Sequence, residues 1–321
     1  MADTDSSVVD PFAHLHEEDF EQPYNHPRLE ASSAFFTGGR KARSLDGDWH
    51  FVLDPFQEGL RQRWFEHDKT PIEDWVTPRD YDDGAWQTSP VPGCWNLTKP
   101  EWFHYEGAAW YSRRFEHDAL KDSERVFLRL GAATGRCRVF LNGRFIGLHF
   151  GSSTPIFAEL SDALIAGENL LMIEVDNSRR ADAVPMHHFD WFNYGGLFRE
   201  VSLFTLPKTF IKHFRLALAP DGKGIAVSVS MSAPVSGQAD LVIKGLGAQS
   251  IAVSEGSGAM VLDMGPELWS PVSPKLYDVS LSFDGDVVRD RGWLSADQPD
   301  GPCDPSQWRG DRPSRYLRTR R

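Results

Sequence analysis

The sequence has few cysteines, no long apolar run and no excess of basic residues. Its three cysteines, Cys94, Cys137 and Cys303, are odd in number and far apart, which argues against a disulfide framework or a zinc site. No 18 consecutive residues are apolar and uncharged, so we expect no membrane span. The acidic N-terminus lacks the apolar core of a signal peptide. Together these absences predict a cytoplasmic protein that does not contact a membrane.

The charge balance and the aromatic content narrow the class of partner. The net charge of −12 argues against nucleic acid, because phosphate binding needs a basic surface. The chain is 321 residues long and 40% hydrophobic, enough to bury one or two large cores. Its eleven tryptophans offer flat rings of the kind on which sugars stack, although most tryptophans pack inside folded domains. A carbohydrate therefore fits better than a nucleic acid.

The first two thirds of the sequence alternate between apolar and polar residues in short runs. The clearest runs are SLDGDWHFVLD, WYSRRF, RVFLRLGA, CRVFLNGRFIGLHF, LLMIEVDN and FREVSLFTLP. Asn142-Gly143 interrupts one of them and predicts a type I′ hairpin turn, because both central residues of that turn need positive φ. A long excursion covers residues 57–85, with a short helix expected near residues 59–66. Many short strands without a long amphipathic helix predict an all-β sandwich of jelly-roll type.

The rest of the chain divides into a second strand-rich region and a tail. Six alternating runs at roughly ten-residue spacing between Phe210 and Phe283 predict an immunoglobulin-like sandwich. The predicted organisation is an N-terminal arm (1–43), a jelly-roll domain (44–207), an immunoglobulin-like domain (208–290) and an irregular tail (291–321). The tail is rich in Arg, Pro, Asp and Gly, and is either a disordered basic segment or the product of a shifted reading frame.

Several phrases resemble the family 2 glycoside hydrolases, the β-galactosidase and β-glucuronidase group. They are SLDGDWHF, GAAWYSRRF, DWFNYGGLFREVSLFTLP and LWSPVSPKLYDVSLSF, which recur in the family's order over about residues 44–290. The resemblance implies a sugar-binding jelly-roll domain followed by an immunoglobulin-like domain. In the family a catalytic barrel comes next, and this sequence ends about where that barrel would begin. The resemblance ends abruptly within a strand after about residue 290, which favours the shifted reading frame for the tail.

The resemblance also implies which chemistry to expect from these residues. Family members are retaining enzymes that take two glutamates from the barrel, the acid/base one directly after an asparagine. This sequence contains no Asn-Glu dipeptide. We therefore assign no catalytic residue, no cofactor and no metal ligand, and expect the chain to be inactive alone.

The candidate sugar-binding residues are Asp190, Asn96, Trp191 and Asn193. By resemblance, Asp190 stands at the family's substrate-contacting aspartate, and Asn96 in VPGCWN at an asparagine that faces the sugar. A carboxylate and an amide can each take two hydroxyl hydrogen bonds and so orient a sugar ring. We expect Asp190 and Asn96 to lie together on one exposed face. The alternatives are a turn or cap residue for Asp190, a loop amide for Asn96, and packing beneath the loop for Trp191.

Three functional interpretations follow. In the first, the chain is the sugar-binding, non-catalytic N-terminal portion of a retaining β-glycosidase, and binds a galactoside or glucuronide weakly. In the second, it is a free-standing carbohydrate-binding or scaffold module, and in the third it is a hydrolase with an unrecognised site. A glycosidase portion should expose an apolar surface where the barrel docks, whereas a free-standing module should not. FNYGGL is nearer the β-glucuronidase branch, but the sequence leaves open both the sugar and whether the protein forms a homo-oligomer.

Overall fold

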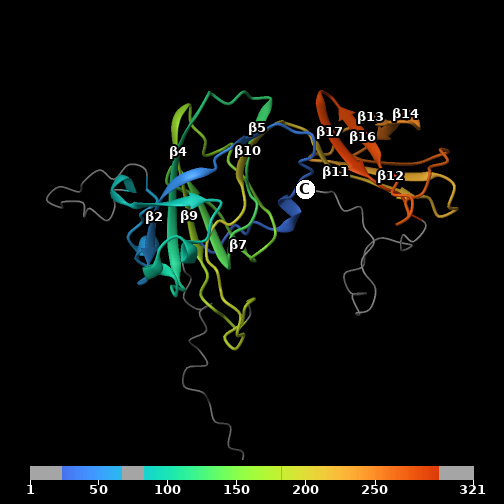
Figure 1. Ribbon diagram of the computed structural model, residues 1–321. Coiled ribbons are helices and arrows are strands. Elements are labelled where there is room, and N and C mark those ends of the chain that lie inside the picture. Colours follow the sequence, from blue (N-terminus) through green and yellow to red (C-terminus); the bar gives the residue numbers. More distant parts are fainter. Residues whose placement is uncertain (1–23, 67–82, 182, 296–321) are drawn as a thin grey trace, which may run out of the picture. The chain divides into compact units, whose positions relative to one another are not determined.

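The computed structural model describes residues 24–66, 83–181 and 183–295 (Figure 1). Within these ranges the chain consists mainly of β-strands paired in antiparallel sheets, together with a single turn of α-helix and short 3-10 helices. The predicted all-β sandwich class is thereby confirmed. No helix in the described part of the chain is long and apolar enough to cross a membrane.

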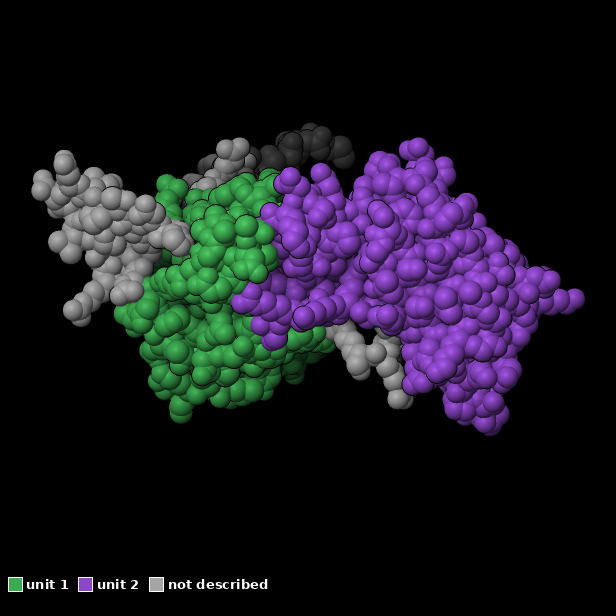
Figure 2. All heavy atoms as spheres, turned by 90° about the horizontal axis from the view of Figure 1, so that it is seen from above, with its two compact units in different colours: residues 1–31, 45–119, 130–201 green, residues 32–44, 120–129, 202–321 purple. Residues whose placement is uncertain are grey.

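The chain forms two compact units, coloured separately in Figure 2. Unit 1 comprises residues 1–31, 45–119 and 130–201, and unit 2 comprises residues 32–44, 120–129 and 202–321. Unit 2 therefore takes two short segments from the region of sequence that otherwise builds unit 1. The boundary between two sandwiches near residue 207 stays a prediction.

A six-stranded antiparallel sheet is the centre of unit 1. Its strands, in order across the sheet, are β3 (Gln87–Val91), β2 (Gly47–Asp54), β4 (Ala108–His117), β9 (Gly167–Asp176), β6 (Arg136–Leu141) and β7 (Arg144–Phe150), while β8 (Ile156–Glu159) lies outside this sheet. The longest pairing joins β4 to β9 over ten residues of each strand. Trp49, Trp110 and Tyr111 are fully buried, so aromatic side chains on β2 and β4 build much of the core.

The hairpin between β6 and β7 turns at the predicted dipeptide. Asn142 has a φ of 50° and Gly143 a φ of 80°. Both torsions lie in the left-handed region that a type I′ turn requires at its two central positions. The pairing of Leu141 with Arg144 closes the turn and confirms the two-residue loop.

The excursion after β2 begins with the short helix that the sequence predicted, although α1 (Glu58–Arg61) is shorter than expected. The Asp54 carboxylate at the end of β2 accepts hydrogen bonds from the N–H groups of Glu58 (2.7 Å) and Gly59 (2.8 Å). It also accepts one from the Trp110 indole at 3.0 Å. Asp54 thus satisfies free N–H groups of the first turn and ties the helix to β4.

Asp83 carries a second buried carboxylate, which makes the stability of unit 1 depend on pH in the acid range. Burial opposes its ionisation, but hydrogen bonds from Arg114 (2.6 and 2.9 Å) and Ser112 (2.5 Å), with the Arg114 charge, hold the pKa of Asp83 below its usual value. A carboxyl group with a lowered folded-state pKa stabilises the fold above its unfolded pKa of about 3.9, and that stability is lost as pH falls through the folded value.

We therefore expect Asp83→Asn to make the stability of unit 1 less dependent on pH in the acid range. The free energy of unfolding should be lower than in the wild type at pH 7, and should fall less steeply between about pH 4 and pH 2. Urea unfolding at a series of pH values measures both quantities. Parallel curves for the two proteins below pH 4 would show that Asp83 does not couple folding to protonation.

Unit 2 contains a seven-stranded sandwich. One sheet has the order β11 (Ile211–Leu218), β12 (Ile225–Met231) and β15 (Ser257–Leu262); the other has the order β14 (Gly247–Val253), β13 (Gly237–Ile243), β16 (Tyr277–Phe283) and β17 (Asp286–Gly292). Buried side chains of both sheets form one apolar cluster, with Ile225 and Leu281 at its fully buried centre. In the same unit β10 (Val201–Pro207) lies between β1 (Ala42–Ser44) and β5 (Glu124–Leu130).

The six predicted strand patterns of this region correspond to β11–β16, but β17 was not predicted as a strand. Its sequence, DVVRDRG, has only Val287 and Val288 as large apolar residues, and its charged positions hide the alternation. Pairing with β16 over seven residues establishes the strand. It continues two residues past the predicted boundary at residue 290, whereas residues 296–321 of the predicted tail lie outside the described residues.

Two of the three cysteines are placed, and both are unpaired thiols. Burial raises the pKa of the Cys94 and Cys137 thiols, so neither has the thiolate character of a reactive or metal-binding cysteine. Cys303 lies outside the described residues.

Candidate functional site

The candidate site is carried by the segment between β9 and β10 in unit 1, whose described residues form neither a helix nor a strand. Asp190 lies in this segment and is exposed. Among the residues that the structure describes, no hydrogen bond or ion pair of its side chain is found. The alternative in which the carboxylate caps a turn is therefore not supported, and its oxygens are open to a ligand.

A pair of asparagines fixes one end of the segment. The Asn177 side chain donates to the Asn193 carbonyl at 2.9 Å, and the Asn193 side chain donates in return to the Asn177 carbonyl. The side-chain oxygen of Asn177, Oδ1, also accepts a hydrogen bond from the Gly107 N–H at 2.8 Å. Asn193 is 4% exposed. Its amide therefore holds the loop. A side chain that contacts a sugar would have to be more exposed than this.

An arginine that follows β9 fixes the part of the segment around Asp190. The Arg179 guanidinium donates through Nη1 to the Phe189 carbonyl (2.7 Å) and through Nη2 to the Trp191 carbonyl (2.9 Å). Its Nε lies 3.0 and 3.1 Å from the two carboxylate oxygens of Glu106. One side chain thus binds the backbone on both sides of Asp190.

Asn96 does not face water, and the expectation that it lies exposed beside Asp190 is wrong. It is 2% exposed. Its Nδ2 donates to the carbonyls of Trp102 (3.2 Å), Phe103 (3.0 Å) and Tyr105 (3.0 Å), while its Oδ1 accepts the Gly195 N–H (2.7 Å). The buried amide is occupied because it must satisfy backbone groups that would otherwise lack partners. Asn96 thus joins its own loop to the segment that carries Asp190.

Two glycines let the segment approach the Asn96 loop closely. A Cβ added at Gly195 would lie 1.8 Å from the Trp95 ring, and one at Gly196 would lie 2.4 Å from the Gly93 carbonyl. The φ of Gly196, 143°, is also one that other residues rarely adopt. These contacts confirm that the glycines serve backbone shape.

The aromatic residues of the segment form two exposed groups. Phe189 and Trp191 stack with ring centroids 4.7 Å apart and planes 17° from parallel, and Trp191 is 50% exposed. Phe192 lies 4.8 Å from Phe103 and 4.6 Å from Tyr194. Trp191 is therefore not packed beneath the loop, and one face of the stacked pair is available to a ligand.

The sequence missed the residues that hold the site: Asn177, Arg179 and Glu106. A signal for the first two was present, since DNSRR is a polar run directly after the apolar strand LLMIEV. Polar side chains at a strand end commonly satisfy the backbone of the next loop. Nothing in the sequence marks Glu106 as their partner.

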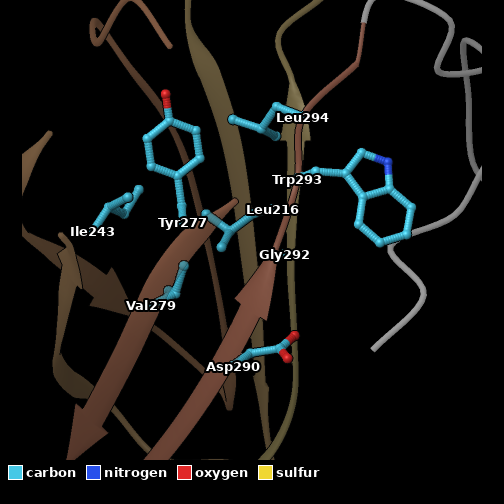
Figure 3. A pocket seen from close by; sticks show the side chains of 8 residues that line it. All are labelled: Leu216, Ile243, Tyr277, Val279, Asp290, Gly292, Trp293 and Leu294. Carbon is cyan, nitrogen blue, oxygen red and sulfur yellow. The ribbon is translucent and has the colours of Figure 1, made fainter. Parts of the chain in front are cut away.

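Unit 2 contains a small cavity that is not a candidate sugar-binding site (Figure 3). It measures about 20 Å³ and is lined mainly by apolar side chains, among them Leu216, Ile243 and Tyr277. Burial raises the pKa of the Asp290 carboxyl group at its edge. Such a volume accommodates about one water molecule. A sugar ring is too large for it.

Comparison with known proteins shows the family to which the chain belongs. The family described as "Glycosyl hydrolases family 2, sugar binding domain" matches residues 42–207, which include Asp190 and Asn96. The β-glucuronidase of Paenibacillus borealis is 24% identical over 268 residues, covering 76% of this chain and 42% of the relative. Human β-glucuronidase is 27% identical over 263 residues, covering 72% of this chain and 39% of the relative.

A solved structure gives the same result for the fold. The β-glucuronidase of an uncultured Clostridium species matches with a TM-score of 0.64 and 27% identity, covering 79% of this chain and 45% of that one. The chain thus spans less than half the length of each of these three relatives. Because the family model covers more than half of the 321 residues, the chain belongs to glycosyl hydrolase family 2.

Proposed function

We propose that this chain supplies a sugar-facing, non-catalytic part of a retaining β-glycosidase of the β-glucuronidase or β-galactosidase type. The observation that carries the proposal is the exposed Asp190 carboxylate on a segment whose backbone is held by Arg179 and Asn177. A fixed carboxylate can accept two hydroxyl hydrogen bonds and so orient a sugar ring. The Trp191 ring beside it offers an apolar face. In this proposal Asn96 and Asn193 shape the site from within.

A free-standing carbohydrate-binding module is the competing proposal, and the surface around Asp190 argues against it. Six large apolar side chains in residues 184–194 are 36–67% exposed: Val184, Met186, Phe189, Trp191, Phe192 and Tyr194. Phe103, in contact with Phe192, is 40% exposed. Exposure of so many large apolar side chains along one short segment is typical of a region that contacts further protein. It favours a site completed by another domain.

We expect the isolated chain to bind methyl β-galactoside or glucuronate only weakly, with a dissociation constant in the millimolar range or above. Two or three hydrogen bonds that replace bonds to water contribute about 1 kcal/mol each. Asp190→Asn should weaken that binding about tenfold, because bonds to a charged acceptor are the stronger ones. Chemical-shift changes in an NMR titration measure both affinities, and the exposed Asp118→Asn serves as the matched control.

The same titration separates the competing proposals. Micromolar binding would favour the free-standing module. Equal affinities for wild type and Asp190→Asn would remove Asp190 from the site. Turnover of an aryl β-glycoside by the purified chain, abolished by replacing one acidic residue, would instead establish a hydrolase.

A further inference from the structure

We propose that Arg179 is a positioning residue for Asp190, and that Glu106 keeps it in that role. Arg179 binds the backbone on both sides of the aspartate through its two Nη atoms, and Glu106 accepts from its Nε. The proposal rests on the proposed function, because it presumes that Asp190 contacts the sugar. It goes beyond that function in naming what sets the direction of the carboxylate.

Arg179 limits the backbone torsions around Asp190. The Phe189 carbonyl belongs to the peptide plane immediately before Asp190, and the Trp191 carbonyl to the plane immediately after Trp191. Both accept from the two Nη atoms of one planar guanidinium group, at 2.7 and 2.9 Å. Because the planar fork holds its donors at a fixed separation, it limits the torsions of the two residues between these planes. The Cα–Cβ direction of Asp190 is fixed with them.

Glu106 balances the charge of Arg179. A guanidinium group close to Asp190 would be expected to pair with its carboxylate, and a paired carboxylate has fewer lone pairs for sugar hydroxyls. Glu106 competes with Asp190 for this charge, because both of its carboxylate oxygens lie against the Nε–H of Arg179, at 3.0 and 3.1 Å. The Arg179 side chain is 20% exposed and that of Glu106 34%, so water screens the pair only in part.

The backbone next to Glu106 is itself held in place. Its neighbour Gly107 donates its N–H to the Asn177 side chain at 2.8 Å, and Asn177 lies two residues before Arg179. The backbone segment that carries Glu106 is therefore joined by a hydrogen bond to the segment that carries Arg179. Carbonyls 189, 191 and 193 all accept side-chain hydrogen bonds from residues 177 and 179. The segment is thus arranged before any ligand arrives, which lowers the entropy lost on binding.

The test compares four variants of the full chain: Arg179→Ala, Arg179→Lys, Glu106→Gln and the control Arg113→Ala. Arg113 also donates to a backbone carbonyl, that of Asp48 at 2.7 Å, but from β4. Three quantities are measured: the NMR order parameters of the amides of residues 189–193, the affinity for methyl β-galactoside, and the melting temperature. Order parameters report the loop directly, whether or not sugar is present.

We expect Arg179→Ala to lower the order parameters of residues 189–193 and to weaken galactoside binding about fivefold, with little change in melting temperature. Arg179→Lys keeps the charge but loses the fork, so it should restore only part of the affinity. Glu106→Gln should keep the loop ordered and still weaken binding, because the uncompensated charge of Arg179 then attracts the Asp190 carboxylate more strongly. Arg113→Ala should match the wild type in all three quantities.

Two results would overturn the proposal. One is an Arg179→Ala loop as ordered as in the wild type. The other is undiminished galactoside binding by Arg179→Ala while Asp190→Asn binds more weakly, which would leave the proposed function standing. If the wild type shows no binding at all, the proposed function fails instead, and the order parameters alone decide whether Arg179 holds the loop.

Discussion

Asp286→Ala is expected to lower the free energy of unfolding of unit 2 by about 3–5 kcal/mol. Asp286 is 5% exposed and pairs with Arg40, whose side chain is 3% exposed, at 2.5 Å. The same carboxylate oxygen accepts the Ile211 N–H at 2.8 Å. Removing the carboxylate leaves a buried guanidinium without its counter-charge and a buried N–H without an acceptor. Both losses act on the folded state.

The surroundings of Arg40 explain why the loss cannot be relieved locally. Its guanidinium also donates to the carbonyls of Phe36 (2.5 Å) and Ile211 (2.9 Å), and it lies over the rings of Phe35 and Phe210 at 5.5 and 5.4 Å. These contacts hold the cation in place. It cannot reach water without breaking them, so the uncompensated charge stays buried.

Urea unfolding followed by NMR signals of unit 2 measures this loss. Asp278→Ala is the matched control, because Asp278 pairs with Arg291 at 2.9 Å while their side chains remain 47% and 67% exposed. An exposed pair contributes about 1 kcal/mol or less. Similar losses for the two variants would show that burial of the Arg40 pair does not set its importance. The double variant Arg40→Met/Asp286→Leu should recover much of the stability, because apolar replacement of both partners removes the buried charges.

The strands could be predicted from the sequence because alternation is a local signal. One face of each strand is buried, so the period of two is written in the residues themselves. The Asn142-Gly143 turn is equally local, since the need for positive φ selects the residues. β17 was not predicted because Arg289 and Arg291 lie among its exposed positions and its alternation is short. Its pairing with β16 supplies what the local pattern lacks.

The site was predicted only in part, and the reason is the distance along the chain between partners. The exposure of Asp190 was expected and is found. Asn96 was expected at the surface, yet its oxygen accepts from Gly195, 99 residues further on. Arg179 and Glu106 are 73 residues apart. A residue type shows what hydrogen bonds a side chain can make, but only the fold shows which buried backbone groups will use them.

Gly195→Ala is expected to destabilise unit 1 by about 3 kcal/mol and to displace the segment that carries Asp190. The added Cβ would lie 1.8 Å from Trp95 Cζ2 and 2.3 Å from Cε2. The φ of Gly195 is not in the left-handed region, so alanine is excluded by the contact alone. Trp95 is fully buried against Phe51 and Tyr105, with ring centroids 6.0 and 6.3 Å apart, and cannot retreat.

Since the ring is fixed, the segment must move by more than about 1 Å to regain ordinary contact distances. That movement breaks two hydrogen bonds: one from the Gly195 N–H to the Asn96 side chain (2.7 Å), and one from the backbone N–H of Trp95 to the Gly195 carbonyl (3.0 Å). The melting temperature should fall by about 10 °C. Gly265→Ala is the control, because a Cβ there meets nothing within 4 Å. A Gly195→Ala protein as stable as this control would mean that the Asn96 loop adapts. In that case the close approach would not be what holds the Asp190 segment.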